Sequence, residues 1–276
     1  MGETRVLTRR DERAARRLLD ADLVANISVA ARVYTHGVER ARLGNDVVGF
    51  FERGRLVSLL SDGYALHPVA ATPAALDAFA QRGERRRCGS IVGPRDQAIG
   101  LWQRLTGLNY AAWASPRSVR DHQPVMVIRA TPRVRPDPRV APAPTRWLDA
   151  YHTAAVAMYT EEVGVAPMDP QGSYRTHVAG LMMKGLAYAV IEADRVVFKA
   201  DVVAEAGGVG QLGGVWLTPE WRGHGLSESL VAAVVASCLA RYDTITLYVN
   251  PYNHPAVHCY ERVGFRQVGE YATVLY

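Results

Sequence analysis

The chain has 276 residues, enough for one large domain or two ordinary ones. Hydrophobic residues make up 49% and charged residues 21% of it, which excludes an intrinsically disordered protein. The formal net charge of +5 comes almost wholly from arginine, since lysine occurs only at Lys184 and Lys199. Abundant arginine and alanine with scarce lysine are also typical of GC-rich coding, so the charge does not by itself indicate a nucleic-acid partner.

Cysteine spacing and hydropathy exclude further classes. The three cysteines are far apart and form no C-x-x-C pair, so we expect neither a disulfide framework nor a zinc site or other metal centre. The N-terminus lacks the apolar core of a signal peptide, and the longest apolar run, residues 230–240, is too short to cross a bilayer. We therefore expect a cytoplasmic protein with no membrane partner and no nucleic-acid partner.

The first half is predicted to alternate helices with strands. Apolar residues recur every four positions between residues 11 and 33, which indicates one helix. Turn residues and alternating apolar positions then favour a strand meander, a helix, a strand, a helix and a strand. These elements are predicted over residues 46–70, 74–83, 89–93, 95–107 and 124–130.

A proline-rich stretch separates the two halves of the chain. Residues 131–145 carry a proline every few positions, which forbids a helix and favours an extended connector. We place a domain boundary there, between residues 1–130 and residues 131–276.

The second half is predicted to follow the order α-α-β-β-β-α-β-α-β, a layered α/β domain. Helices are expected at 145–164 and 173–185, and strands at 186–193, 195–206 and 209–218. The remaining elements are a helix after the glycine-containing turn at 222–227, a strand at 244–250, a helix at 255–264 and the last strands at 266–276.

The turn between the third strand and the next helix has the chemistry of an anion site. In "VWLTPEWRGHGLSESL", residues 215–230, a strand passes through R-G-x-G directly into a helix. Glycine lets the backbone turn tightly, and the opening helix presents unpaired N–H groups and the positive end of its dipole. The pattern therefore predicts a small concave anion-binding turn.

This segment, followed by "LYVNPYNHPAVHCYERVGF", resembles motifs A and B of the GCN5-related N-acetyltransferase (GNAT) superfamily. Motif A, [Q/R]-x-x-G-x-[G/A], is written here with Arg222, Gly225 and Ser227, where serine replaces the family's Gly or Ala. Motif B is represented by Asn253, Ala256, Tyr260, Gly264 and Phe265. The resemblance covers roughly residues 134–276.

The resemblance implies a fold and a cofactor. It implies a GNAT fold with a central mixed, mostly antiparallel sheet in the C-terminal half, and acetyl-CoA as acetyl donor with CoA as product. The turn would bind the pyrophosphate, and the strand before it would separate from its neighbour, so that main-chain groups of Val215 and Leu217 form hydrogen bonds to pantetheine and the acetyl carbonyl. An ordinary central strand is the alternative. The cofactor-binding residues implied are Val215, Trp216, Leu217, Arg222, Gly223, His224, Gly225, Leu226, Ser227, Asn250, Asn253 and Tyr260.

Several of these residues also have an ordinary structural interpretation. His224 is compatible with a solvated loop, and Asn250 and Asn253 with turns, because Asn-Pro and Pro-x-Asn favour turns. Tyr260 follows Asn253 by seven residues, as the family's catalytic tyrosine does, and the resemblance implies that its phenol protonates the departing CoA thiolate. Its alternative is a half-buried aromatic on an amphipathic helix.

The base that accepts the amine proton is not defined by the motif. Many relatives place a glutamate on the strand before the turn, where this chain offers only Gln211. The candidates are Glu161 and Glu162, at the end of the first helix of this half, and Asp201, if its side chain faces the cleft. Water could relay the proton instead, and a solvated surface pair is the alternative for the two glutamates. If the pair lines the cleft, we expect a cationic acceptor.

The first half resembles a degenerate second copy of the same fold. Its best match to the turn, "SIVGPRDQAIGLW" at residues 90–102, lacks the R-x-x-G-x-G pattern. Residues 1–130 are thus predicted to form a smaller, degenerate GNAT-like or accessory α/β domain that shapes the structure or the acceptor site. The arrangement resembles tandem acetyltransferases and acetyltransferases of GC-rich bacteria with an N-terminal domain of unknown function.

The function implied is an acetyl-CoA-dependent N-acetyltransferase that acts on a primary amine, of a small molecule or a peptide, by direct attack in a ternary complex. A non-catalytic CoA-sensing or scaffold module is the alternative, motivated by Gln211 and Ser227. The chain is expected to be a monomer or a homodimer.

Overall fold

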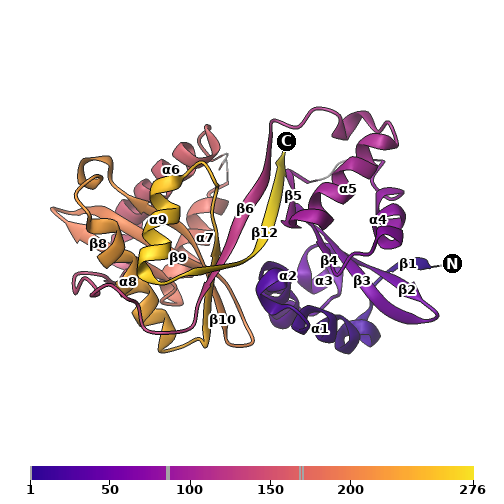
Figure 1. Cartoon of the computed structure of the whole chain (residues 1–276), viewed down its shortest axis with the longest axis horizontal. Coiled ribbons are helices and arrows are strands. Elements are labelled where there is room, and N and C mark those ends of the chain that lie inside the picture. Colours follow the sequence, from indigo (N-terminus) through magenta and orange to yellow (C-terminus); the bar gives the residue numbers. More distant parts are fainter. Residues whose placement is uncertain (1, 85–87, 168, 170) are drawn as a thin grey trace. The chain divides into compact units, whose positions relative to one another are not determined.

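The computed structural model describes residues 2–84, 88–167, 169 and 171–276, and it divides into two compact units. The first unit comprises Met1–Val125, Tyr248–Tyr252 and Gln267–Tyr276, and the second comprises Met126–Leu247 and Asn253–Arg266. The chain thus passes from the first unit to the second, returns to the first over Tyr248–Tyr252, and ends in the first unit with its last strand (Figure 1).

The strands of the first unit follow the order β1-β2-β3-β4-β5-β12-β6. From β1 to β12 in this order, neighbouring strands pair antiparallel except β4 and β5, which are parallel. Helices α4 and α5 enclose a hydrophobic core that includes Phe79, Leu101 and Trp113. The elements are β1 (Glu3–Val6), η1 (Arg9–Asp11), α1 (Glu12–Asp20), α2 (Leu23–His36), α3 (Arg40–Leu43), β2 (Asp46–Glu52), β3 (Arg55–Asp62), β4 (Ala65–Val69), α4 (Pro73–Ala80), β5 (Ser90–Pro94), α5 (Arg95–Gly107), η2 (Ala111–Trp113), β6 (Ser118–Ile128) and β12 (Arg266–Leu275).

The sheet of the second unit runs β11-β10-β9-β8-β7. Its β10 and β11 are parallel and the other pairs are antiparallel, so the predicted mixed, mostly antiparallel sheet is confirmed. The elements are β7 (Ala141–Pro142), η3 (Thr145–Trp147), α6 (Leu148–Val163), α7 (Ser173–Met183), β8 (Ala187–Glu192), β9 (Arg195–Ala206), β10 (Val209–Leu217), η4 (Pro219–Trp221), α8 (Leu226–Leu239), β11 (Thr244–Tyr248) and α9 (His254–Val263).

Helices cover both faces of this second sheet. On one face, Tyr151 of α6 reaches Asp201 of β9, with 2.6 Å between the hydroxyl and a carboxylate oxygen. On the other, Ser237 of α8 lies 3.5 Å from the hydroxyl of Tyr188 in β8. Successive side chains of a strand point to opposite faces, so Lys199 and Asp201 share the α6 face.

Two expectations about the elements were wrong. Residues 11–33 form two helices, α1 and α2, because Asp22 interrupts the first and caps the second, its carboxylate accepting a 3.0 Å bond from the Ala25 amide. Residues 266–276 form one long strand, β12, where more than one was expected. In contrast, the limits predicted for α5 and β9 coincide with the observed ones.

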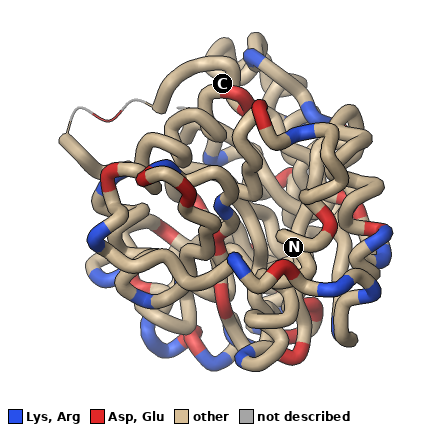
Figure 2. The backbone as a smooth tube through the Cα atoms, turned by 90° about the vertical axis from the view of Figure 1, so that its left-hand side faces the viewer, with Lys and Arg blue, Asp and Glu red and all other residues tan. Residues whose placement is uncertain are grey.

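In the view of Figure 2, positively and negatively charged residues are both spread along the described backbone. Among the residues that the structure describes, no helix has the length and apolar character needed to cross a membrane.

Candidate functional site

The strands β10 and β11 separate partway along their length. They pair in parallel only where Val209–Gln211 meets Thr244–Thr246, although β10 continues to Leu217. Burial changes at the same place: residues 209–212 are buried, whereas residues 213–216 are partly exposed. One edge of β10 is therefore left without its neighbour from residue 212 onward, which is the opening that the resemblance implied.

A bulge distorts β10 in this opening. Gly213 pairs with Asp201 and Trp216 with Lys199, so two residues of β10, Gly214 and Val215, lie opposite the single Ala200 of β9. Gly214 has a φ of +56°, in the left-handed region where glycine is strongly favoured.

After the bulge, the main chain of Leu217 faces the open edge. The Thr218 amide donates to the Val197 carbonyl at 2.8 Å, so Thr218 bonds toward β9. Backbone groups alternate between the two edges of a strand, and those of Leu217 point the other way. The Leu217 carbonyl accepts a 2.8 Å bond from Nε of Arg222, which leaves its amide for a ligand.

The turn after β10 has the conformation expected of an anion site. Gly225 caps α8 at φ +71°, and a Cβ placed there or at Gly223 would meet no atom within 4 Å. The 14-residue helix α8 begins at the next position, Leu226, and is anchored by buried residues from Leu230 onward. Its first-turn carboxylate, Glu228, is paired with Arg262 at 2.7 Å. The exposed turn from 222 to 225 therefore leaves the helix N-terminus open to an anion.

Arg222 and Glu161 connect this turn to α6. Nη2 of Arg222 lies 2.8 Å from one Glu161 oxygen, and the Trp216 indole donates to the other at 3.1 Å. Both members of the ion pair are a little under half exposed. Glu161 is thus held by two residues of the predicted cofactor site.

Tyr260 is buried in α9 and its ring packs edge-on against Phe265, with 5.7 Å between the centroids. Burial, with smaller contributions from Cys259 and Glu162, raises the pKa of its phenol above the usual range. The phenol is therefore protonated at neutral pH, as a proton donor requires.

Glu162 acts electrostatically on a group of tyrosines. Burial raises the pKa of Tyr174 to about 12, with added contributions from Asp201, Tyr159 and Glu162. The rings of Tyr159 and Tyr174 meet at 5.8 Å. Since Glu162 also contributes to the raised pKa of Tyr260, its carboxylate is close enough to influence both Tyr174 and Tyr260.

Asp201 is buried and engaged on both oxygens. One oxygen lies 2.5 Å from Nζ of Lys199, and the other accepts from the Tyr151 hydroxyl. Lys199 and Tyr151 were not among the residues proposed from the sequence. The signal for Lys199 was present: a lysine in the apolar run "VVFKADVV" of a chain that has only two lysines.

The two asparagines have separate structural roles. Asn253 is exposed and caps α9, where its side chain accepts a 3.2 Å hydrogen bond from the Ala256 amide. Asn250 belongs to the first unit, where it accepts from Gln123 at 2.9 Å, and Gln123 in turn accepts from Thr273 at 2.6 Å. A contact of either asparagine with the cofactor stays a prediction.

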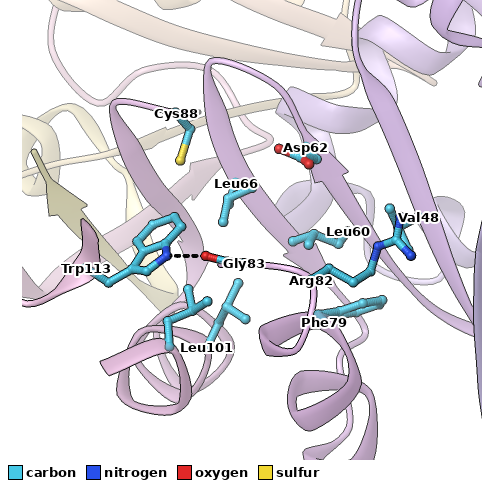
Figure 3. A pocket seen from close by; sticks show the side chains of 11 residues that line it. Val48, Leu60, Asp62, Leu66, Phe79, Arg82, Gly83, Cys88, Leu101 and Trp113 are labelled. Carbon is cyan, nitrogen blue, oxygen red and sulfur yellow. Dashed lines mark hydrogen bonds between the residues drawn. The ribbon is translucent and has the colours of Figure 1, made fainter. Parts of the chain in front are cut away.

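The first unit contains a cavity of about 30 Å³ with a mostly apolar lining (Figure 3). It lies among Val48, Leu60, Phe79 and Leu101, and the Trp113 indole at its side donates to the Gly83 carbonyl at 2.6 Å. That volume holds about one or two water molecules, so the cavity is a packing void too small for a cofactor. Within residues 2–84, 88–167, 169 and 171–276, no group of three His, Cys, Asp or Glu side chains is placed to bind a metal.

Comparisons with known proteins agree with this geometry. Residues 188–274 match the family model described as FR47-like protein, and residues 45–151 match a domain of unknown function, DUF4081. No curated protein gives a significant sequence match.

Solved structures resemble the whole chain in fold. A GNAT-family acetyltransferase from Colwellia psychrerythraea is 11% identical with a TM-score of 0.59, and the match covers 99% of each chain. A GCN5-related N-acetyltransferase from Sphaerobacter thermophilus is 18% identical with a TM-score of 0.60, over 99% of this chain and 94% of the other. A tandem GNAT protein from the clavulanic acid biosynthesis pathway is 13% identical with a TM-score of 0.51, over 100% and 98%.

The separated strands, the bulge and the glycine turn define a protein with a GNAT fold. The FR47-like match over residues 188–274 agrees with this fold, and the DUF4081 match lies toward the N-terminus at residues 45–151.

Proposed function

We propose that this protein is an acetyl-CoA-dependent N-acetyltransferase that acts on a primary amine of a small molecule or peptide. The observation that carries the proposal is the opening between β10 and β11, which leads directly to the glycine turn and the N-terminus of α8. A strand edge with free main-chain groups that ends at an anion site suits an extended ligand with a pyrophosphate, which is the shape of CoA.

Acetyl-CoA would be held mainly by the backbone. The turn from Arg222 to Ser227 would bind the pyrophosphate through its amides, while the Arg222 side chain is already used by Leu217 and Glu161. The main chain at Val215 and Leu217 would pair with pantetheine, and Trp216 would support the strand from the opposite face through Glu161. When bound, acetyl-CoA supplies the activated acetyl group.

The reaction would be a direct transfer in a ternary complex. The acceptor amine forms a bond to the acetyl carbon as the thioester carbon–sulfur bond breaks, and the electron pair leaves with sulfur. The Tyr260 hydroxyl would donate its proton to this thiolate. We propose that Glu162, in the last turn of α6, accepts the proton from the amine.

The other two candidate bases belong to networks of their own. Glu161 is already paired with Arg222 and Trp216, and Asp201 with Lys199 and Tyr151. We propose that the first unit, which matches DUF4081 over part of its length, serves as an accessory domain.

The experiment that tests cofactor binding is calorimetric titration of acetyl-CoA with two variants of one residue. Ser227→Glu adds a carboxylate to the first turn of α8, which favours the helix but repels pyrophosphate, and we expect at least tenfold weaker binding. Ser227→Ala, the matched control, introduces a residue usual in the family and should bind at least as tightly. Absence of acetyl-CoA binding by the unmodified protein at near-millimolar concentration would refute the proposal.

A CoA-sensing module is the second candidate, favoured by one observation. The strand before the turn carries the buried Gln211 where many relatives carry a glutamate. Release of CoA over a panel of amines and peptides separates the two functions. For the enzyme, Tyr260→Phe should lower kcat by about 10²–10⁴-fold with unchanged acetyl-CoA affinity. Tight binding with no release on any acceptor would favour the sensor.

A further inference from the structure

A buried charged network lies beneath the bulge of β10. Lys199 is fully buried and Asp201 is 6% exposed, and their charged atoms approach to 2.5 Å. Tyr151 of α6 is also fully buried. Burying an ion pair removes two charges from water, and well-packed apolar side chains are often as stabilising. Stability alone is therefore a weak reason for this network.

The network is bonded to the main chain of the bulge. In addition to its ion pair with Asp201, Nζ of Lys199 donates a hydrogen bond to the Gly214 carbonyl at 2.8 Å. The same atom lies 5.3 Å from the centre of the Tyr151 ring. Asp201 is held in turn by the Tyr151 hydroxyl at 2.6 Å. The three side chains thus connect α6 and β9 to a single carbonyl of β10.

The fit between network and bulge is tight. A Cβ at Gly214 would lie 2.5 Å from an Asp201 oxygen and 2.7 Å from Nζ of Lys199, closer than real contacts allow. Glycine is therefore needed at 214 both for its positive φ and for the space the charged groups occupy.

Holding this carbonyl also sets the direction of the next amide. In a planar trans peptide, the C=O of Gly214 and the N–H of Val215 point in opposite directions. With the carbonyl fixed on Lys199, the Val215 amide is directed away from it, at the part of β10 where β11 has separated.

We propose that Lys199, Asp201 and Tyr151 are positioning residues that hold the bulge so that the Val215 amide binds the acetyl carbonyl of acetyl-CoA. The inference rests on the proposed function for its ligand, but the hold on the bulge is a property of the free protein. It also gives Asp201 a role other than proton transfer, since both its oxygens are engaged.

The test is the double substitution Lys199→Met/Asp201→Leu, which removes both charges together and so leaves no unpaired one in the interior. We expect a folded protein whose Val215 amide exchanges with solvent at least tenfold faster, with exchange unchanged at Gly210 and Gln211. Acetyl-CoA should bind about tenfold more weakly, as loss of one or two hydrogen bonds implies. ADP, which probes the turn alone, should bind as before.

The outcomes separate the inference from the proposed function. If the unmodified protein binds neither ADP nor acetyl-CoA, the proposed function fails, and the exchange of Val215 still decides whether the network holds the bulge. Unchanged exchange and unchanged acetyl-CoA affinity in a folded double variant would overturn the inference. An equal loss of ADP and acetyl-CoA affinity would also overturn it, because it indicates a general structural role.

If the double variant does not fold, Tyr151→Phe decides by the same measurements. This substitution removes one hydroxyl and keeps the ring over Lys199. We expect the same selective loss of acetyl-CoA binding, reduced to about threefold. Unchanged Val215 exchange and acetyl-CoA affinity in this variant would overturn the inference.

Discussion

Glu161 and Glu162 are neighbours in the chain, but the helix turns their side chains about 100° apart. That rotation gives them different surroundings: Glu161 meets Arg222 and Trp216, whereas Glu162 acts on Tyr174 and Tyr260. The sequence could indicate only a pair of acids near the acceptor loop. We propose that Glu161 belongs to the cofactor site and Glu162 to the acceptor site.

The two substitutions should therefore have different effects on kinetics. Glu162→Gln should raise KM for a cationic amine about tenfold to a hundredfold, since one charge-assisted hydrogen bond is lost, with little change in acetyl-CoA affinity. Glu161→Gln should weaken acetyl-CoA binding by no more than about fivefold, because its ion pair is half exposed. Steady-state kinetics and calorimetry on both variants give the comparison. Equal effects on both parameters would contradict the assignment.

A histidine in the first unit makes a prediction about pH. Desolvation of the partly buried His67 in β4, with a smaller effect of Arg32, lowers the pKa of its imidazole to about 4. The unfolded state, with a pKa near 6.5, therefore binds more protons between pH 4 and 6.5, so stability rises with pH in that window. The contribution is complete above pH 6.5 and is lost as pH falls toward 4.

His67→Gln should remove this dependence. We expect the free energy of unfolding of the unmodified protein to fall by about 1–3 kcal/mol more than that of the variant between pH 7 and pH 4. Urea titrations at several pH values measure the difference, and carboxylates that titrate in both proteins cancel. Parallel curves for the two proteins would show that His67 is not the group responsible.

At the scale of elements, local pattern predicted most helices and strands but not where a helix is interrupted. Apolar residues continue every four positions through residues 11–33, so periodicity favours one helix. The interruption depends on Asp22, whose conformation is neither helical nor extended and whose side chain caps α2. A capping residue does not interrupt the apolar periodicity, so the pattern alone does not predict where the helix breaks.

Asp22 provides the element-scale test. Asp22→Ala should destabilise the first unit by about 1 kcal/mol, because the Ala25 amide loses its partner. Asp22→Asn keeps a capping oxygen and is the matched control, with most of the stability expected to return. Thermal or urea unfolding monitored by circular dichroism measures both. A full loss in the asparagine variant would point to charge, and not capping, as the cause.

At the scale of the whole chain, the glycine turn was predictable because its chemistry is local, but the association of distant segments was not. The roles of Arg222 and Gly225 follow from their neighbours in the sequence. Lys199, in contrast, contacts Tyr151 of α6, which lies 48 positions earlier in the chain, and Gly214 of the next strand. Likewise, nothing in "RQVGEYATVLY" indicates that this strand returns to the first unit to pair with β5. Pairing between strands far apart in the chain depends on tertiary packing, which periodicity does not record.

The return of β12 leads to a prediction about the first unit. Five residues, Tyr271–Leu275, pair with Ser90–Pro94 of β5, and Tyr271, Ala272 and Val274 are buried. The Tyr271 hydroxyl also donates to the Ala25 carbonyl of α2 at 2.6 Å. Removal of residues 267–276 would thus expose the edge of β5 and open the core beside α2.

We expect the truncated chain to lose cooperative folding of the first unit. Three buried side chains at about 1–3 kcal/mol each, together with the lost strand pairing, approach the 5–15 kcal/mol that stabilises a typical domain. Hydrogen exchange followed by mass spectrometry should show protection lost across β2–β5, and a synthetic peptide of residues 266–276 should restore part of it. As control, Val268→Thr changes a side chain that is 54% exposed at the other end of β12 and should leave protection intact. Undiminished protection in the truncated chain would mean that residues 2–125 fold without this strand.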